Sequence, residues 1–191
     1  MLDPGQEQDI IRRIVAGDKA LYALLVDAYT GPLFNLALRM TGKHADAEDA
    51  VQDAFLKAYA MLRSFDTQKR FFTWLYSICL NVLRDRQRHT ARAAERFTAD
   101  EVEATPSAAP GPDATALANE REAAVLRALA RLPLAEREAV VLRYMQDISF
   151  CEVAAILNIS ENAAKKRVYQ ALRRLHGLLR EFGAAQPDSH R

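Results

Sequence analysis

A capped helix followed at once by a basic helix is the feature that most constrains the fold of this chain. Within residues 147–158, Ser149 and Glu152 have the spacing of a capping box, in which each side chain satisfies a backbone N–H at the other residue. A short turn follows, and Ser160 is placed to cap the next helix. Residues 161–180 carry Glu161 as their only acid and six cations: Lys165, Lys166, Arg167, Arg173, Arg174 and Arg180. Two helices joined by a tight turn, the second one basic, are typical of a helix-turn-helix that reads the DNA major groove.

Composition favours an all-α protein with unevenly distributed charge. Half of the 191 residues are hydrophobic, 27% are charged, and Gly and Pro number only 7 each. The net charge is +1. However, residues 1–90 carry 12 basic and 11 acidic side chains, residues 91–120 carry 2 and 6, and residues 121–191 carry 12 and 8. Because local charge governs contact with phosphate, the small net charge does not argue against DNA binding.

The hydrophobic pattern divides the chain into two helical domains and a linker. Apolar periodicity predicts helices over residues 5–16, 18–29, 32–41, 45–62 and 73–89, then over 120–132 and 135–145 before the helix-turn-helix. Pro106, Pro110 and Pro112 exclude a continuous helix in residues 90–119. We therefore predict an all-α fold with one domain at residues 1–90, a flexible acidic linker at 91–119, a helix-turn-helix domain at 120–183 and a disordered tail at 184–191.

The helix expected at residues 45–62 has one core face and one acidic face. Its core face carries Ala47, Ala50, Val51, Ala54, Phe55, Ala58 and Leu62. Asp49, Gln52, Asp53 and Leu56 lie on the opposite face. Acids on an exposed helix face are often simply solvated, and composition alone leaves that alternative open. An exposed Leu among acids favours a surface that binds another protein, because apolar anchors ringed by polar groups are typical of interfaces.

The helix expected at residues 73–89 buries Leu75, Ile78, Cys79 and Val82 and has a polar stripe on its other side. The stripe consists of Thr73, Ser77, Asn81, Arg84 and Arg88. Phe71 and Phe72 lie in the loop before it. Cations can neutralise phosphates, and loop aromatics offer stacking surface for unpaired bases, so this combination suits single-stranded or melted DNA. The alternative is a surface helix with core aromatics, which is the better interpretation for Trp74.

The basic helix has its own division into two faces. Ala164, Val168, Ala171, Leu172, Leu175 and Leu179 form the expected core stripe. The outward residues are Asn162, Lys166, Tyr169, Gln170 and Arg173, flanked by Lys165 and Arg167. Polar side chains near the N-terminal end of such a helix read bases, and flanking cations hold phosphates.

Other function classes find less support in the sequence. The four histidines are scattered, and there is no phosphate-binding glycine loop, so a small helical enzyme is disfavoured and neither a metal site nor a cofactor is expected. Cys79 and Cys151 are far apart and are expected to be buried core residues. No apolar run is expected to reach the roughly 20 residues of a membrane span, and the N-terminus does not resemble a signal peptide, so we expect a cytoplasmic protein without membrane insertion.

Three segments, in this order, resemble the extracytoplasmic-function type of bacterial RNA polymerase sigma factor. Residues 44–59 (HADAEDAVQDAFLKAY) resemble the region 2.2 motif, and residues 65–89 (FDTQKRFFTWLYSICLNVLRDRQRH) resemble the region that recognises the −10 promoter element. Residues 132–175 resemble region 4, which recognises the −35 element. The resemblance implies a promoter-specificity subunit that binds core RNA polymerase and promoter DNA. It leaves open whether an anti-sigma factor binds the chain.

The resemblance also implies roles for particular residues. Asp49, Gln52 and Asp53 match positions that contact the coiled coil of the beta-prime clamp. The loop from Phe65 to Phe72 matches the loop that captures a flipped base, with Asn81 nearby. Positions that face the −35 element are matched by Lys165, Lys166, Tyr169 and Gln170.

Two departures from the family pattern concern the −35 element. This chain has Asn162-Ala163-Ala164 where a Gly-Thr-Val-like run is usual, which removes a hydroxyl that would contact phosphate. Gln170 stands where a basic residue is common, which suggests an altered −35 preference. A stand-alone helix-turn-helix regulator is the alternative to a sigma factor, but it would leave the acidic face and the −10 segment without a purpose.

Overall fold

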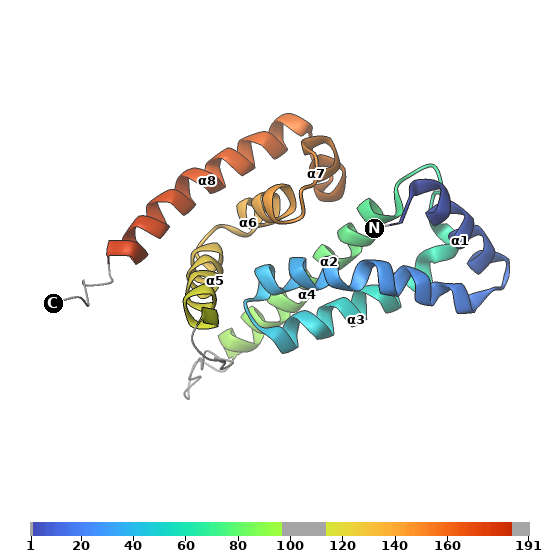
Figure 1. Ribbon diagram of the computed structural model, residues 1–191, viewed down its shortest axis with the longest axis horizontal. Helices are drawn as coiled ribbons and strands as arrows, with labels where there is room; N and C mark the ends of the chain where they lie inside the picture. Colours follow the sequence, from blue (N-terminus) through green and yellow to red (C-terminus); the bar gives the residue numbers. More distant parts are fainter. Residues whose placement is uncertain (1, 97–113, 185–191) are drawn as a thin grey trace.

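The computed structural model describes residues 2–96 and 114–184, and the regular structure in these ranges is entirely helical. Two helical units are visible in Figure 1, α1–α4 and α5–α8, as predicted. The first contains α1 (Pro4–Ala16), η1 (Lys19–Leu21), α2 (Tyr22–Thr41), α3 (His44–Met61), η2 (Leu62–Ser64) and α4 (Phe71–Arg96). The second contains α5 (Ala114–Ala130), α6 (Leu134–Val140), the single π-helical turn η3 (Val141–Met145), α7 (Phe150–Leu157) and α8 (Glu161–Ala184).

One long helix, α2, replaces the two helices predicted at residues 18–29 and 32–41. Pro32 lies inside this helix and does not begin a new one. The helix continues because its buried residues follow one another at helical spacing on both sides of Pro32: Leu25, Tyr29, Leu33, Leu36, Ala37 and Met40. Burial of that continuous face outweighs the hydrogen bond that proline cannot donate. Gly42 ends the helix in the left-handed conformation, with φ 71°.

By length and composition alone, the segment Lys19–Thr41 is apolar enough to cross a membrane, which corrects our expectation from the sequence. Its six buried side chains belong to the core of the first unit, where α2 packs against α3 and α4. The core helix of a soluble protein passes the same test of length and hydropathy, so a single such segment is weak evidence for a membrane span.

The first unit buries the faces that were predicted for α3 and α4. All seven residues of the expected α3 core face are buried, and so are Leu75, Ile78, Cys79 and Val82 of α4. Burial raises the pKa of the Cys79 thiol to about 12. Helical periodicity therefore placed the buried faces of both helices correctly.

The helix-turn-helix is formed by α7 and α8. Ser149 and Glu152 make the predicted capping box at the start of α7, and the backbone N–H of Ala163 donates to the hydroxyl of Ser160, 3.2 Å away. Two predictions of burial are wrong. Cys151 lies on the solvent side of the first turn of α7, and Leu179 is 41% exposed because α8 extends past the helices that cover its N-terminal half.

The predicted linker is shorter at both ends than residues 91–119. The helix α4 continues to Arg96, and α5 begins at Ala114 rather than near residue 120. The three prolines that define the linker, and residues 185–191 of the predicted tail, lie outside the described residues. Residue 184 of that tail is the last residue of α8.

Candidate nucleic-acid and protein interfaces

The outer face of α8 carries the residues predicted to read duplex DNA. Asn162, Lys166, Tyr169 and Arg173 are exposed, whereas Lys165, Arg167 and Gln170 are half-buried. Tyr169 is 56% exposed and packs against Phe150, with 6.3 Å between ring centroids. The ammonium group of Lys165 lies 2.6 Å from the Glu161 carboxylate, so one of the expected cations already has a partner within the helix.

The polar stripe of α4 is present, and its arginines are engaged. Asn81 is exposed and accepts a hydrogen bond from the guanidinium of Arg84 at 3.0 Å. Arg88 pairs with Asp85 on the same helix. Thr73 and Ser77, nearer the start of the helix, are half-buried. Asn81 and Arg88 are therefore the exposed residues of the stripe, and Arg84 also interacts with the second unit.

Arg84 forms a two-pronged ion pair with Glu138 of α6. Its Nε and Nη2 donate to the two carboxylate oxygens at 2.6 and 2.8 Å. The Glu138 side chain is 3% exposed, and the hydrogen bond to Glu138 raises the pKa of Arg84. Glu138 is a residue that sequence reasoning missed, because nothing in the pattern of α6 indicates a partner 54 positions away.

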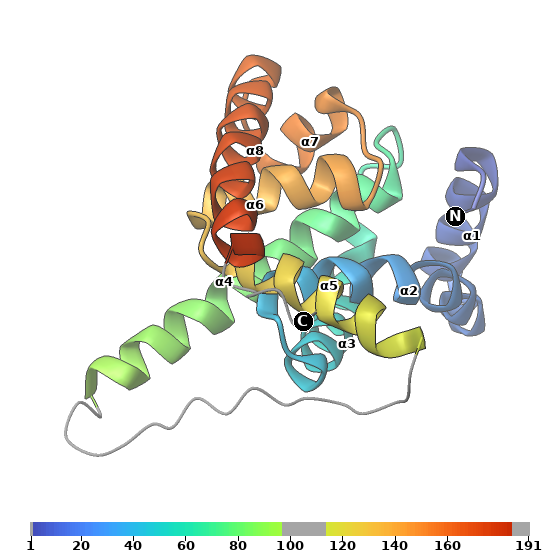
Figure 2. The ribbon, with the colours of Figure 1, turned by 60° about the vertical axis from the view of Figure 1, so that its left-hand side comes forward.

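Further contacts join the second unit to α4, to the loop before it and to α2. The Tyr76 hydroxyl donates to the side-chain carbonyl of Gln146 at 2.9 Å, and Arg70 donates to Glu152 at 2.8 Å. Arg137 donates to the backbone carbonyl of Met40 at 3.0 Å. Figure 1 shows the second unit lying along α2 and α4, and Figure 2 shows α6 and α7 above α4 from another side. In this arrangement part of the expected −10 surface is covered.

The aromatic residues expected to stack on bases are buried, so that prediction is wrong for this conformation. Phe71 and Phe72 lie on the first turn of α4 and face the core, and Phe65 is buried beside them. The Phe71 ring contacts Tyr29 and Phe65, each with 5.7 Å between centroids. These rings anchor the loop between η2 and α4 to the core of the first unit. The sequence could not reveal this, because α4 begins two residues earlier than predicted and its first turn faces inward.

The acidic face of α3 is exposed as predicted. Leu56 is 63% exposed, and Asp49 and Gln52 lie on the surface beside it. Arg86 of α4 reaches this face: its guanidinium lies 2.5 Å from Asp53 and 3.6 Å from Asp49. Both carboxylates raise the pKa of Arg86. The acidic face is thus partly neutralised by a cation of the same chain.

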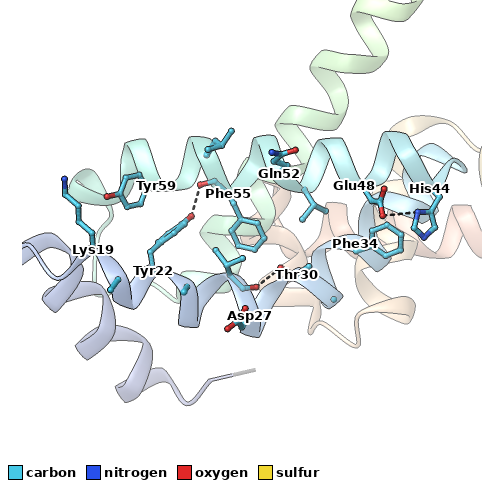
Figure 3. Close-up of a pocket in the computed structure, with 16 residues that line it drawn as sticks. Lys19, Tyr22, Asp27, Thr30, Phe34, His44, Glu48, Gln52, Phe55 and Tyr59 are labelled. Carbon is cyan, nitrogen blue, oxygen red and sulfur yellow. Dashed lines mark hydrogen bonds and ion pairs between the residues drawn. The ribbon is translucent and has the colours of Figure 1, made fainter.

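A broad apolar groove of about 1060 Å³ runs between α2 and α3 and ends at this acidic face. Figure 3 shows Tyr22, Phe34, Phe55 and Tyr59 lining it, with Gln52 at its edge. The Tyr22 hydroxyl donates to the backbone carbonyl of Phe55 at 2.7 Å, which ties the two helices together beneath the groove. Reasoning from the sequence identified Leu56 and Gln52 as exposed, but it missed the side of the groove formed by α2. The residues of α2 that line the groove, among them Tyr22, Val26 and Phe34, form a second apolar stripe. This stripe was not recognised because two separate helices were predicted there.

Two sigma-factor family models match this chain, one in each unit. Residues 25–93 match the family model described as Sigma-70 region 2, and residues 122–175 match Sigma-70, region 4. The ECF RNA polymerase sigma factor SigW of Bacillus subtilis is 31% identical over an alignment of 181 residues that covers 90% of this chain and 96% of SigW. The ECF RNA polymerase sigma-E factor of Escherichia coli K12 is 30% identical, over 86% of this chain and 90% of that protein.

Solved structures agree with these matches. CnrH in complex with the cytosolic domain of CnrY aligns with a TM-score of 0.67 and 28% identity, covering 91% of this chain and 97% of CnrH. The sigma factor RpoE of Bartonella quintana, in complex with the anti-sigma factor NepR, aligns with a TM-score of 0.66 and 26% identity, over 83% and 96% of the two chains. The chain belongs to the extracytoplasmic-function (ECF) sigma factors, which direct promoter-specific transcription initiation and are not a family of enzymes.

Proposed function

We propose that α2 and α3 bind core RNA polymerase, that α8 reads the −35 element and that α4 holds the melted −10 element. The observation that carries this proposal is the meeting of the apolar groove with the acidic face of α3 in a chain of the ECF sigma family. The apolar groove ends beside Asp49, Gln52 and Asp53, and Leu56 is an exposed apolar anchor at its edge. Such a surface suits a helical partner that has apolar residues and flanking cations. We infer that this partner is the coiled coil of the beta-prime clamp.

The second unit is proposed to bind the −35 duplex. The exposed polar residues of α8 lie on the side of the helix opposite Ala164, Val168 and Ala171, which are buried in the unit. Lys166, Tyr169 and Gln170 are the proposed base-reading residues, with Asn162 beside them, and Lys165, Arg167 and Arg173 hold phosphates. We propose that the two domains expected from the sequence, residues 1–90 and 120–183, divide the work in this way.

For the −10 element we propose the stripe of α4 without the aromatic stacking. Asn81 hydrogen-bonds a flipped base, Thr73 and Ser77 lie along the path of the strand, and Arg84 and Arg88 hold its phosphates. The rings of Phe65, Phe71 and Phe72 keep the neighbouring loop in shape. Because Arg84 is paired with Glu138 in the free chain, the second unit must move away before Arg84 can reach DNA. We propose that core polymerase binds the separated form more tightly and thereby shifts the chain toward it.

An anti-sigma factor is a further proposed partner. Two structurally similar sigma factors are in complex with the cytosolic domain of CnrY and with the anti-sigma factor NepR. A partner that occupied the α2–α3 groove would exclude polymerase by direct competition. Because polymerase and promoter DNA are cytoplasmic, the proposed function implies that the chain acts in the cytoplasm.

Charge reversal on α3 tests the polymerase assignment. The variant Asp53→Lys should weaken binding to core polymerase by several kcal/mol if the carboxylate is desolvated at the interface, and by about 1 kcal/mol or less if it lies at the rim. The control Asp9→Lys makes the same change on the exposed face of α1. Unchanged affinity of Asp53→Lys for core, with its helical content intact by circular dichroism, would refute the proposed docking surface.

A further inference from the structure

A buried carboxylate of α1 lies beside the loop between η2 and α4, in a part of the chain that the family model does not match. Among the described residues, three charged side chains are buried: Glu7, Glu136 and Glu138. The last two pair with Arg174 and Arg84. Glu7 is 2% exposed, and it precedes the matched segment, which begins at residue 25. Burial of a carboxylate is unfavourable unless partners compensate it, so the contacts of Glu7 indicate what holds it there.

Glu7 joins three elements of the first unit. Its carboxyl group accepts a hydrogen bond from the Tyr29 hydroxyl of α2, and it shares a small cavity with Phe71, the first residue of α4. Burial raises the pKa of Glu7, and Arg70 and the backbone N–H of Phe71 act in the opposite direction. Arg70, the last residue of the loop, lies close enough to attract it electrostatically. A carboxylate at a helix N-terminus also interacts favourably with the helix dipole. Glu7 thereby fixes the point where the loop enters α4.

The neighbouring side chain fixes the middle of the same loop. The amide of Gln8 donates to the backbone carbonyl of Thr67 at 2.9 Å. Within the loop, Asp66 accepts hydrogen bonds from the backbone N–H groups of Gln68 and Lys69, both at 3.0 Å, which form a turn but do not attach it to the bundle.

Packing between α1 and this loop is incomplete. A cavity of about 40 Å³ separates them, lined by Glu7 and Gln8 on one side and by Gln68 and Lys69 on the other. The cavity is too small for a base, so it is not itself a binding site for one. Because side chains do not fill this space, the hydrogen bonds of Glu7 and Gln8 add to the support that the buried rings of Phe65 and Phe71 give the loop.

We propose that Glu7 and Gln8 are positioning residues for capture of the −10 element. They hold the loop of residues 65–70 in a fixed shape before DNA arrives, so that binding of a flipped base does not have to order the loop. This inference rests on the proposed function of the loop and of Asn81. It adds α1 to the promoter-opening apparatus through its contacts with the loop.

The test compares two glutamines of α1 in holoenzyme. The variant Gln8→Ala removes the donor to Thr67, and the matched control Gln6→Ala makes the same change at an exposed position of the same helix. Permanganate reactivity of thymines measures opening of a promoter identified by mapping transcription start sites. We expect Gln8→Ala to lower the open-complex equilibrium about two- to tenfold, the range of one net hydrogen bond. Affinity for core and for −35 duplex should match that of Gln6→Ala.

A spectroscopic measurement separates positioning from a role in stability. Trp74 is the only tryptophan of the chain, and its ring centroid lies 4.9 Å from that of Phe65, at the start of the loop. Gln8→Ala should increase acrylamide quenching of Trp74 without lowering the melting temperature of the free chain. Glu7→Gln, which keeps the shape but removes the charge, should increase quenching in the same direction.

Each outcome decides the inference. If Asn81→Ala impairs opening and Gln8→Ala does not, the inference fails while the proposed −10 site stands. If neither variant impairs opening, the −10 assignment fails and the inference with it. A parallel loss of melting temperature, core binding and opening in Gln8→Ala would mean that α1 serves only the fold, and this also overturns the inference.

Discussion

Breaking the ion pair between Arg84 and Glu138 should make the free chain a better ligand for single-stranded −10 DNA. In the variant Glu138→Ala, Arg84 keeps its hydrogen bond to Asn81 and remains partly exposed, so no buried charge is left without a partner. The second unit loses its strongest contact with α4, while the contacts made by Tyr76 and Arg70 remain. The change therefore shifts the balance between covered and uncovered forms of α4 without damaging either unit.

The magnitude follows from the two hydrogen bonds of 2.6 and 2.8 Å. Hydrogen bonds to charged groups contribute about 1.5–3 kcal/mol each, but the two share one ion pair whose members are rehydrated when the units separate. We therefore expect a net loss of about 2–3 kcal/mol, or roughly 30- to 150-fold in the equilibrium between the forms. If the covered form dominates, the apparent affinity for −10 DNA rises by the same factor, because only the uncovered form binds.

The assay is fluorescence anisotropy of a labelled single-stranded −10 oligonucleotide with the free chain. Glu161→Ala is the control, because it also removes one carboxylate from the second unit, but its partner Lys165 belongs to the same helix. Glu138→Gln, which keeps the shape of the side chain, should give an intermediate gain. Equal affinities of Glu138→Ala and Glu161→Ala would show that the second unit does not restrict access to α4, and the reasoning would be refuted.

Three further predictions concern other surfaces of the molecule. Arg86→Ala should tighten core binding up to about fivefold at low salt, since Arg86 competes with cations of the partner for the acidic face; weaker binding in a titration with core would contradict this. Gln170→Ala should relax base preference at one or two −35 positions by roughly 1–3 kcal/mol. Arg167→Ala should weaken binding to all DNA sequences alike and reduce the salt dependence of that binding, and footprinting over a range of salt concentrations tests both variants. Only Cys151 should react with Ellman's reagent at pH 8, because Cys79 is buried and its pKa is raised to about 12; two thiols reacting in the folded chain would be inconsistent with the structure.

Local patterns predicted those parts of the molecule that depend on neighbours in the sequence. The capping box of Ser149 and Glu152 is a contact over three residues, and it is present as expected. The faces of α3 and α4 follow from helical periodicity alone, so Leu56 and Asn81 were correctly placed on the surface. The same reasoning failed at Pro32, where local turn chemistry predicted a break and burial of one continuous face kept the helix intact.

The sequence by itself determined two helical units, their order and the faces that each helix presents, because these depend on spacing along the chain. Only the tertiary structure decided how those faces are used. Phe71 lies in the core because α1 and α2 pack against the first turn of α4, and Glu7 is buried there by the same packing. Arg84 is occupied because α6 brings Glu138 to it from a distant part of the chain. Pairings of this kind join residues whose separation in sequence carries no periodic signal, so no pattern within either segment could reveal them.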